Sequence, residues 1–377
     1  MTNNNKPKVS IVMSSYNHER FIEKCIESVI HQTFQDWEFI IFDDCSTDNT
    51  YQIAKKYENK KIKVYKSPYN RGMVQNNNEA IKLSKGQYVS HLNSDDFWDS
   101  AKLEKQVGFL DKNSTYAAVF TDINLINEQD KIISDTNFTS FRKKFVTESR
   151  DRFQWLNYWF YYGNCLCYTS SLIRKECFNK IGLYNPAYIV LLDFDMWIRI
   201  CMAGYEIYVL QEKLTNFRLL NKDKNLGKSQ NKFLSYVETG NVINNYLNIK
   251  NKDEFSRIFP EYNKDKLKNN EMKYCLADLI IEQILSDSRK IEEKYLRRLR
   301  DHFLISFLFD EINRDPQTLD ILQRNFSFDF RKYTSLSISP SLCSSNFTSK
   351  KKKLVKFLLK SYIVVSLIAI IYFITSL

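Results

Sequence analysis

Glycine is scarce in this sequence, and its rarity excludes one large class of nucleotide-binding enzyme. The chain has 8 glycines in 377 residues, and none of them forms the G-x-G-x-x-G pattern that cradles a dinucleotide. We therefore do not expect a nicotinamide-dependent dehydrogenase. The 8 cysteines include no C-x-x-C pair. They are expected to be reduced thiols in the core of an intracellular protein.

The N-terminal residues also lack the basic-then-apolar pattern of a secretory signal, so the folded part is expected to stay in the cytoplasm. The net charge is +11, but lysines crowd the short stretch 350–360, so nucleic acid is not an expected partner. Residues 361–377 are uncharged and apolar, enough for a helix of roughly 25 Å. We expect this C-terminal segment to anchor the protein to the cytoplasmic face of the cell membrane, and a buried core helix is the alternative.

Strand and helix patterns alternate along the first part of the chain. Short apolar runs alternate with stretches whose apolar residues recur at helical spacing. The predicted strands are 8–17, 37–44, 61–67 and 87–93, and the predicted helices are 19–32, 49–58 and 72–85. This order predicts an α/β fold with a mostly parallel sheet and helices on both faces.

The organisation changes after residue 220. Residues 221–349 show helical spacing with many charges, so we predict a catalytic or binding domain over 1–220 and a helical accessory region over 221–349. Residues 350–377 then form the basic stretch and the apolar membrane segment.

Polar residues follow each of the first four predicted strands. Because ligands of open parallel sheets bind beyond the carboxyl ends of the strands, these residues predict one site. They are Ser14 to Asn17, Asp43 with Asp44, Asn70 with Arg71, and Asn93 to Asp96. The adjacent carboxylates of Asp95 and Asp96 repel each other unless a cation offsets the cost. A nucleotide diphosphate carrying Mg²⁺ or Mn²⁺ would supply it.

Six motifs in this order resemble the inverting glycosyltransferases of family 2, which have the GT-A fold. The resemblance covers roughly residues 7 to 220. The motifs are "VSIVMSSYN", "SVIHQTFQDWEFIIFDDCSTDNT", "NRG", "LNSDDFW", "SSLIRKECFNKIGLYN" and "LLDFDMWIRI".

The resemblance implies roles in binding a nucleotide-sugar donor. Asp44, or its neighbour Asp43, would accept the imide hydrogen of a uracil-type base. Asn17 and the backbone near Ser14 would frame the nucleotide, and Arg71 would lie near the diphosphate or the base. The alternatives are a turn or helix-capping role for Asp44 and an exposed loop charge for Arg71.

The "NSDD" motif corresponds to the family's D-x-D motif, which contacts ribose and metal. Here Asn93 stands where the family often has Asp. Either Asn93 still hydrogen-bonds the ribose while Asp95 binds the metal, or Asp95 and Asp96 divide the work. We favour Asp95 as the metal ligand, with Asp96 next. Alternatively, Asp96 caps a helix that begins near Ser100.

The family's general base is the Asp of a Glu-Asp pair at a helix start. Asp193 aligns with that base, Leu192 replaces the Glu, and Asp195 is the alternative base. A carboxylate within hydrogen-bond reach of the acceptor hydroxyl suits this role. Aromatic residues between 155 and 162 would contact the acceptor or belong to the core.

The resemblance thus implies a metal-dependent, inverting hexosyltransferase. It would move a sugar, most simply from a UDP-sugar, to a hydroxyl of a growing surface glycan or lipid-linked saccharide. The alternative is a degenerate nucleotide-sugar-binding protein that recruits or regulates a partner enzyme, because Asn93 and Leu192 depart from the family pattern. The glycine-free stretch "SIVMSSYNHER" argues against a nucleotidyltransferase.

Overall fold

The structure, a computed structural model, describes residues 6–133, 145, 148–220 and 232–262, together with 272, 275, 276 and 279. The chain divides into two compact units, Met1–Phe307 and Leu308–Leu377, and every described residue lies in the first. Within this described part, no helix combines the length and apolarity needed to cross a membrane. The predicted membrane segment and most of the predicted helical region lie outside it, and the predicted domain boundaries stay predictions.

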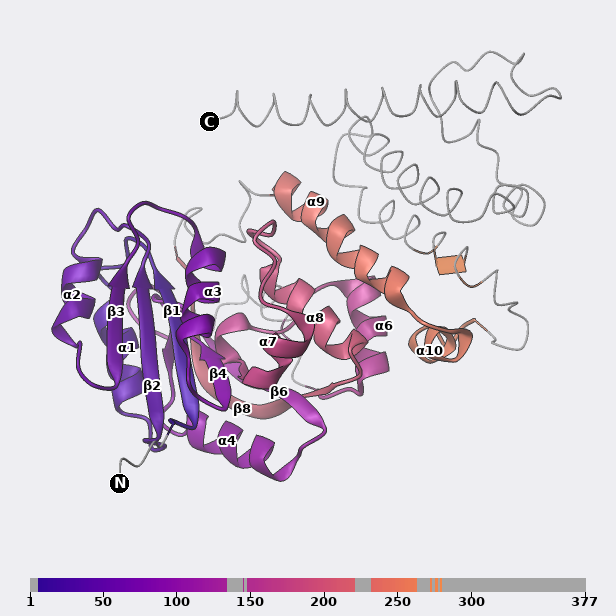
Figure 1. The fold of residues 1–377 in the computed structure, drawn as a ribbon, viewed down its shortest axis with the longest axis horizontal. Coiled ribbons are helices and arrows are strands. Elements are labelled where there is room, and N and C mark those ends of the chain that lie inside the picture. Colours follow the sequence, from indigo (N-terminus) through magenta and orange to yellow (C-terminus); the bar gives the residue numbers. More distant parts are fainter. Residues whose placement is uncertain are drawn as a thin grey trace, which may run out of the picture. The chain divides into compact units, whose positions relative to one another are not determined.

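The described residues build one mixed sheet of eight strands flanked by helices (Figure 1). The strand order is β3-β2-β1-β4-β7-β6-β8-β5. The strands are β1 (Val9–Ser15), β2 (Trp37–Asp43), β3 (Ile62–Lys66), β4 (Tyr88–His91), β5 (Phe97–Trp98), β6 (Tyr116–Ile126), β7 (Leu172–Arg174) and β8 (Glu206–Arg218).

The first half of the chain folds as its alternating pattern predicts. Strands β3, β2, β1 and β4 pair in parallel. The connecting helices are α1 (Ile22–Ile30), α2 (Thr50–Lys56) and α3 (Met73–Leu83). In α1 the buried residues recur at helical spacing and form one stripe toward the sheet, namely Ile22, Cys25, Ile26 and Val29. Burial of this stripe holds the helix against the strands.

The prediction of a mostly parallel sheet is wrong for the strands beyond β4. Strand β7 pairs antiparallel with both β4 and β6, and β5 pairs antiparallel with β8, whereas β6 and β8 are parallel. Strands β7 and β5 have three and two residues, too few to show a periodic pattern in the sequence. Their directions are set by long-range pairing instead, and the sheet is mixed.

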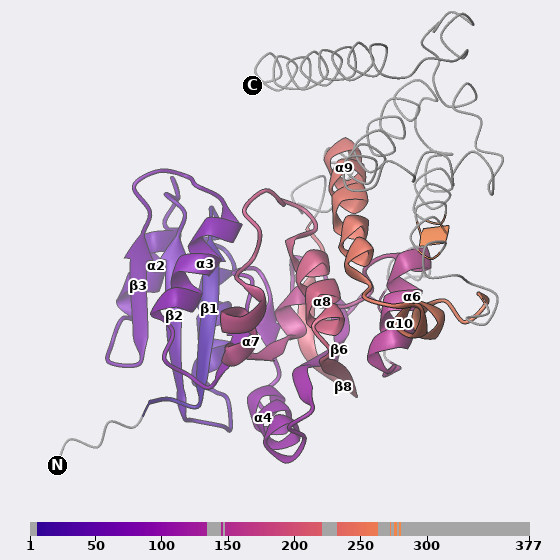
Figure 2. The same cartoon turned by 45° about the vertical axis from the view of Figure 1, so that its right-hand side comes forward.

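Alternate residues of the central strands face two separate cores, as the period of two in a strand requires. Val9, Ile11 and Met13 of β1 pack with α1, α2 and α4 (Lys102–Lys112). Val12 of the same strand belongs to the core that includes α3, α7 (Lys175–Ile181) and α8 (Leu192–Met202). The sheet is therefore covered on both faces, as predicted (Figure 2).

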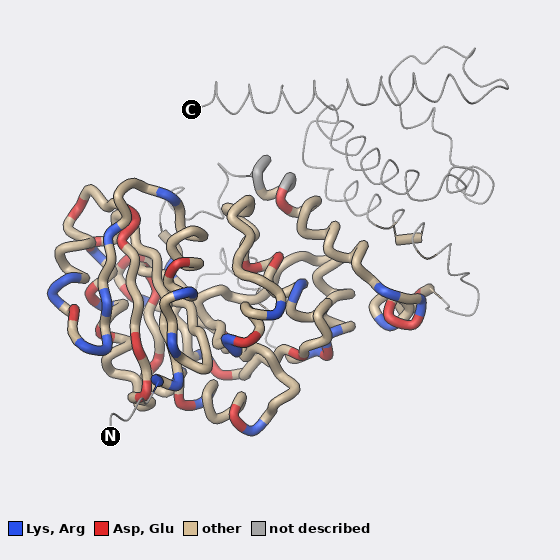
Figure 3. Tube along the Cα trace, viewed as in Figure 1, with Lys and Arg blue, Asp and Glu red and all other residues tan. Residues whose placement is uncertain are grey.

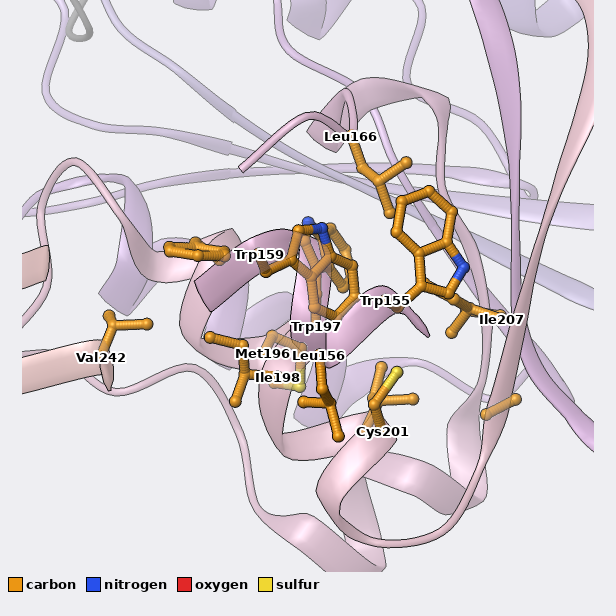
Figure 4. Packing of buried hydrophobic residues seen from close by; sticks show 14 of the residues in the cluster. Trp155, Leu156, Trp159, Leu166, Met196, Trp197, Ile198, Cys201, Ile207 and Val242 are labelled. Atoms are coloured by element: carbon orange, nitrogen blue, oxygen red, sulfur yellow. The ribbon is translucent and has the colours of Figure 1, made fainter. Parts of the chain in front are cut away.

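The second core is rich in tryptophan. Helix α6 (Arg152–Tyr162) begins with a capping box between Asp151 and Gln154 and contributes Trp155 and Trp159, while Trp197 comes from α8 (Figure 4). All three indoles are at most 1% exposed. The core interpretation of these aromatics is correct for Trp155 and Trp159.

Helices from the start of the predicted accessory region pack on this core. They are α9 (Lys232–Ile243), the 3₁₀ helix η4 (Asn244–Asn248) and α10 (Lys252–Ile258). Helix α9 runs beside α8 in both ribbon views (Figures 1 and 2). The hydroxyl of Tyr246 donates a 2.7 Å hydrogen bond to the carbonyl of Leu156. Acidic and basic residues are interspersed along the elements of the sheet (Figure 3).

Candidate active site

The carboxyl ends of β1 and β2 meet at one edge of the sheet. Ser15 is in register with Asp43, and the Asp44 N–H donates a 2.8 Å hydrogen bond to the Ser15 carbonyl. Asn17 follows β1 with a positive φ of 52°, and its Oδ1 accepts a 2.9 Å hydrogen bond from the N–H of Thr47. The loops after the two strands are thus bound to each other, as the sheet topology predicts.

Asp44 fastens the loop after β3 to this edge. Its carboxylate accepts 2.9 Å hydrogen bonds from the N–H groups of Arg71 and Gly72. Gly72 has a φ of 87°, a conformation that L side chains rarely adopt, so glycine is needed to present this N–H. The "NRG" motif and Asp44 therefore form one local structure.

Arg71 is bound within the site rather than free as a loop charge. Its Nε donates a 2.6 Å hydrogen bond to Asn76 Oδ1, and Asn76 Nδ2 donates at 3.2 Å to Ser14 Oγ. Asn76 is fully buried and joins the predicted residues Ser14 and Arg71. The guanidinium also lies 5.4 Å from the ring centre of Phe42.

Asp43 combines a turn role with an unused oxygen. Its Oδ2 accepts a 2.9 Å hydrogen bond from the N–H of Ser46, so the turn role expected as an alternative for Asp44 falls to Asp43. Its Oδ1 and the neighbouring Ser15 Oγ are buried and have no hydrogen-bond partner among the described residues. Such unsatisfied acceptors and donors cost free energy, and a bound ligand is one way to satisfy them.

The two adjacent carboxylates after β4 have different surroundings. Asp96 is 2% exposed, and its oxygens accept hydrogen bonds from the Arg218 N–H at 2.8 Å and from Asn93 Nδ2 at 3.2 Å. Asp95 is half-buried, and no other described residue donates a hydrogen bond to its carboxylate. Asp95 is therefore available to a ligand, whereas Asp96 is committed to the fold.

Asp96 does not cap the following helix, so that alternative is wrong. The N–H of Ala101, just before α4, donates to Asp99 Oδ1 at 3.0 Å instead. Asp96 instead accepts a hydrogen bond from the backbone N–H of Arg218 in β8, which lies 122 residues further along the chain. Only the tertiary structure brings that partner close.

Arg218 supports the loop that carries Asp95 and Asp96, residues 93–96, which we call the acidic loop. Its side chain is 1% exposed, and its Nε donates a 2.7 Å hydrogen bond to the Asp95 carbonyl. Another guanidinium nitrogen lies 2.6 Å from a carboxylate oxygen of Asp130. Burial raises the pKa of Asp96 well above its ordinary value, and the charge of Asp95 raises it further. Burial also raises the pKa of Asp95, while His18 and Arg218 oppose that shift.

The metal-binding groups of this site fit one divalent cation whose other ligands come from a bound molecule. Among the described residues no group of three or more His, Cys, Asp or Glu side chains could hold a metal ion alone. Asp95 offers one uncommitted carboxylate, a hard oxygen ligand of the kind Mg²⁺ and Mn²⁺ prefer. Mg²⁺ is commonly held by one or two carboxylates plus substrate phosphates. The residues present therefore fit a metal that arrives with a diphosphate.

His18 joins the edge formed by β1 and β2 to the acidic loop, a contact that the sequence did not reveal. Its ring Nδ1 lies 2.8 Å from Ser94 Oγ, and its backbone N–H donates a 2.8 Å hydrogen bond to Thr50 Oγ1. His91, by contrast, is a fully buried core residue. Burial lowers the pKa of His91 to about 3, so the ring stays neutral in its contacts with Ser171 and Tyr184.

Asp193 lies in the first turn of α8, half-buried, with partners that orient it. Its Oδ2 accepts a 3.0 Å hydrogen bond from Asn164 Nδ2, and its Oδ1 accepts a 2.7 Å bond from the N–H of Phe194. Burial raises the pKa of Asp193 to about 6, while these hydrogen bonds act in the opposite direction. A carboxylate with this pKa is ionised at neutral pH and still basic enough to accept a proton.

Asp195, the alternative base, is bound on both sides. It is 3% exposed, its Oδ2 accepts a 2.7 Å hydrogen bond from Arg199 Nε, and its Oδ1 accepts a 3.0 Å bond from Asn245 Nδ2. Arg199 and Asp195 thus form an ion pair one turn apart in α8. The geometry favours Asp193 over Asp195 as a reactive group.

One segment, 164–171, connects the acidic loop to Asp193. Asn164 at one end binds Asp193, and Thr169 Oγ1 accepts a 3.4 Å hydrogen bond from the Asn93 N–H. Between them, burial raises the pKa of the Cys167 thiol, and the charges of Asp96 and Asp193 raise it further. The carboxylates of Asp96 and Asp193 therefore both act on segment 164–171.

Several side chains of this site escape sequence reasoning. They are Asn76, Asn164, Arg218 and Glu238, which hold other site residues rather than stand in a motif of their own. The stretch "NFRLL" around Arg218 carries no signal of its role. Asn164, just after a glycine and close to an aromatic run, offers only a turn signal.

Comparison with known proteins agrees with this arrangement. A sequence model described as glycosyl transferase family 2 matches residues 10–182. The putative teichuronic acid biosynthesis glycosyltransferase TuaG of Bacillus subtilis is 33% identical over 220 residues, which span 57% of this chain and 81% of TuaG. The UDP-Glc:alpha-D-GlcNAc-diphosphoundecaprenol beta-1,3-glucosyltransferase WfaP of Escherichia coli is 29% identical over 238 residues, 62% of this chain and 85% of WfaP.

The fold is shared with a solved structure. The crystal structure of S. aureus TarS in complex with UDP-GlcNAc superposes with a TM-score of 0.53 at 17% identity, over 84% of this chain and 91% of that chain. The chain belongs to glycosyl transferase family 2, and its α/β fold is of the GT-A type.

Proposed function

We propose that this protein transfers a hexose from a UDP-sugar to a hydroxyl of a saccharide or lipid-linked saccharide, with inversion at the anomeric carbon. The observation that carries the proposal is that segment 164–171 binds both Asp193 and Asn93, which lies two residues before the uncommitted Asp95. Relatives named for teichuronic acid biosynthesis and for glucosyl transfer to a diphosphoundecaprenol-linked sugar support a role in surface polysaccharide synthesis.

The nucleotide would bind along the edge formed by β1 and β2. The buried Asp43 Oδ1 and the frame built by Asn17, Asp44 and Arg71 support uracil and diphosphate recognition there. Asp95 would hold Mg²⁺ or Mn²⁺ together with the diphosphate. When bound, the metal would stabilise the negative charge that develops on the leaving phosphate. Arg71 would add a fixed positive charge beside it.

Asp193 would accept the proton of the acceptor hydroxyl as that oxygen attacks the anomeric carbon. Attack from the face opposite the diphosphate breaks the donor bond in one step and inverts the centre. Asn164 keeps the carboxylate oriented, and burial keeps its pKa near 6. Localisation at the cytoplasmic face of the membrane stays a proposal from the sequence of residues 350–377.

The direct test is sugar transfer by the purified full-length chain from a panel of UDP-sugars, with Mn²⁺, Mg²⁺ or EDTA. We expect one donor to be used, activity to require the metal, and the product to have the opposite anomeric configuration by NMR. Asp193→Asn should lower kcat by about 10³ and leave donor binding intact. Asp195→Asn is the matched control, and it should keep measurable transfer because Asp195 serves the fold.

The same experiment separates the alternative, a nucleotide-sugar-binding protein without turnover. Asn93 and Leu192, which depart from the family pattern, motivate that alternative. Donor binding by calorimetry without transfer to any acceptor, and with Asp193→Asn indistinguishable from wild type, would establish it. No binding of any nucleotide under any metal condition would refute both readings.

A further inference from the structure

Glu238 of α9 makes an unusual set of contacts for a buried acid. It is 2% exposed, and its carboxylate accepts hydrogen bonds from three consecutive backbone N–H groups. These are Ile189 at 2.7 Å, Val190 at 2.9 Å and Leu191 at 2.7 Å. Within the described residues no lysine, arginine or histidine forms an ion pair with it. The loop itself therefore solvates the charge.

The loop bound by Glu238 leads directly into α8. Leu191 is the residue before the helix, and Asp193 lies two residues further on. Three charge-assisted hydrogen bonds to successive N–H groups fix both the position and the direction of such a loop. Because the carboxylate comes from α9, outside the stretch with family motifs, this support is invisible along the local sequence.

We infer that Glu238 is a positioning residue for the proposed base: it holds residues 189–191 and thereby fixes the start of α8 and the direction of Asp193. This inference rests on the proposed function, because it takes Asp193 as the base. The acid beside the start of α8 thus comes from α9, a different element.

The charge of Glu238 also acts on Asp193. Burial is the main cause of the raised pKa of Asp193, and the charge of Glu238 raises it further. On α8 itself, Asp195 is paired with Arg199. The other groups acting with Asp193 are two phenols and a thiol, whose pKa values burial raises, so that they stay neutral. They are Tyr168, Tyr184 and Cys167. Among these groups, Glu238 is thus the negatively charged residue that acts on Asp193 from an element other than α8.

The test compares Glu238→Gln, Glu238→Asp and Thr239→Val in the full chain. Glutamine keeps the shape, removes the charge and leaves an N–H donor unpaired. Aspartate keeps the charge but shortens the reach. Thr239, whose hydroxyl bonds within α9 to the Ser235 carbonyl, is the control on the same helix. The readouts are kcat and KM for the donor across pH, and ¹³C NMR titration of Asp193 in aspartate-labelled protein, assigned with Asp193→Asn.

Glu238→Gln should lower kcat by roughly tenfold or more, because a displaced base costs much of its effect. It should also move the acid limb of the pH profile down by about one unit, as removal of a nearby negative charge requires. Donor KM should not change, because Glu238 makes no hydrogen bond or ion pair to the described residues at the edge formed by β1 and β2. Glu238→Asp should lower kcat with the limb near its wild-type position, and Thr239→Val should change neither.

A folded Glu238→Gln variant with wild-type kcat and an unmoved limb would overturn the inference. So would equal losses in Glu238→Gln and Thr239→Val, because these would indicate a general effect on stability. If the glutamine variant does not fold, Glu238→Asp decides. A lowered kcat with the acid limb of the pH profile near its wild-type position would support the inference, and a wild-type kcat would overturn it. If wild type itself transfers no sugar, the proposed function fails. The NMR titration then decides separately whether Glu238 acts on Asp193.

Discussion

The Nδ2 of Asn164 donates a 3.0 Å hydrogen bond to Oδ2 of Asp193, and the two residues are 29 positions apart. This contact holds the proposed base from the loop after α6, outside its own helix. It also favours the ionised form of the carboxylate, because a hydrogen bond donated to a charged group lowers the pKa of an acid.

Asn164→Ala should therefore raise the pKa of Asp193 above about 6. The acid limb of kcat/KM should move to higher pH, by about one unit, and kcat should fall. A pH profile of transfer measures both. Asn157→Ala is the control, since Asn157 on α6 bonds the Ile258 carbonyl and should cost stability without moving the limb. An unmoved limb in Asn164→Ala would contradict the assignment.

The wild-type pH profile carries its own prediction. Asp193 works as a base only when ionised, and burial raises its pKa to about 6. The rate should therefore be constant near neutral pH and fall tenfold per pH unit below about 6, measured as kcat/KM with saturating metal. A limb near about 4, the ordinary value for aspartate, would show that the base is solvated or is a different residue.

Asp95 and Asp96 should respond differently to the same substitution. Asp95→Asn should abolish metal-dependent donor binding with little change in stability, because no other described residue donates to that carboxylate. Asp96→Asn should cost about 1–3 kcal/mol, because its amide would face the Arg218 N–H and leave donors unpaired. Calorimetry with Mn²⁺ and urea unfolding measure the two effects. Equal effects in both variants would argue against the division of roles.

Arg218 should prove necessary to the acidic loop. Arg218→Leu removes a buried guanidinium and leaves the half-buried carbonyl groups of Asp95 and Asn127 without this donor, so the free energy of unfolding should fall by roughly 3 kcal/mol. The control is Arg20→Gln, which breaks the exposed ion pair with Glu128 and should cost less than about 1 kcal/mol. If both variants unfold at the same urea concentration, Arg218 does not carry the loop.

Two glycine substitutions test a close contact with strand β1 and a position inside helix α4. A Cβ at Gly86 would lie 2.5 Å from the Ser10 backbone nitrogen, so Gly86→Ala should destabilise by about 1–3 kcal/mol. Gly108 lies inside α4 with no atom near its added Cβ, so Gly108→Ala should stabilise by about 0.5–1 kcal/mol. Opposite shifts in thermal unfolding are expected. Equal shifts would show that the contact at Gly86 is not close in solution.

Local patterns were sufficient for the first half of the described fold. The β-α alternation through residue 93 predicted the parallel strands, and the polar residues after them lie at one edge, as expected of strands that end together. The buried stripe of α1 also followed from the helical spacing of its apolar residues.

The sequence by itself determined the family motifs, the four parallel strands and the chemical type of each candidate group. The tertiary structure alone decided how those groups divide their work. Asp95 and Asp96 are chemically identical neighbours, and only the return of β8 commits Asp96 to the Arg218 N–H. Asp193 likewise depends on Asn164 and on the loop that Glu238 binds. These partners lie far apart along the chain, and burial and hydrogen bonding act on distance in space.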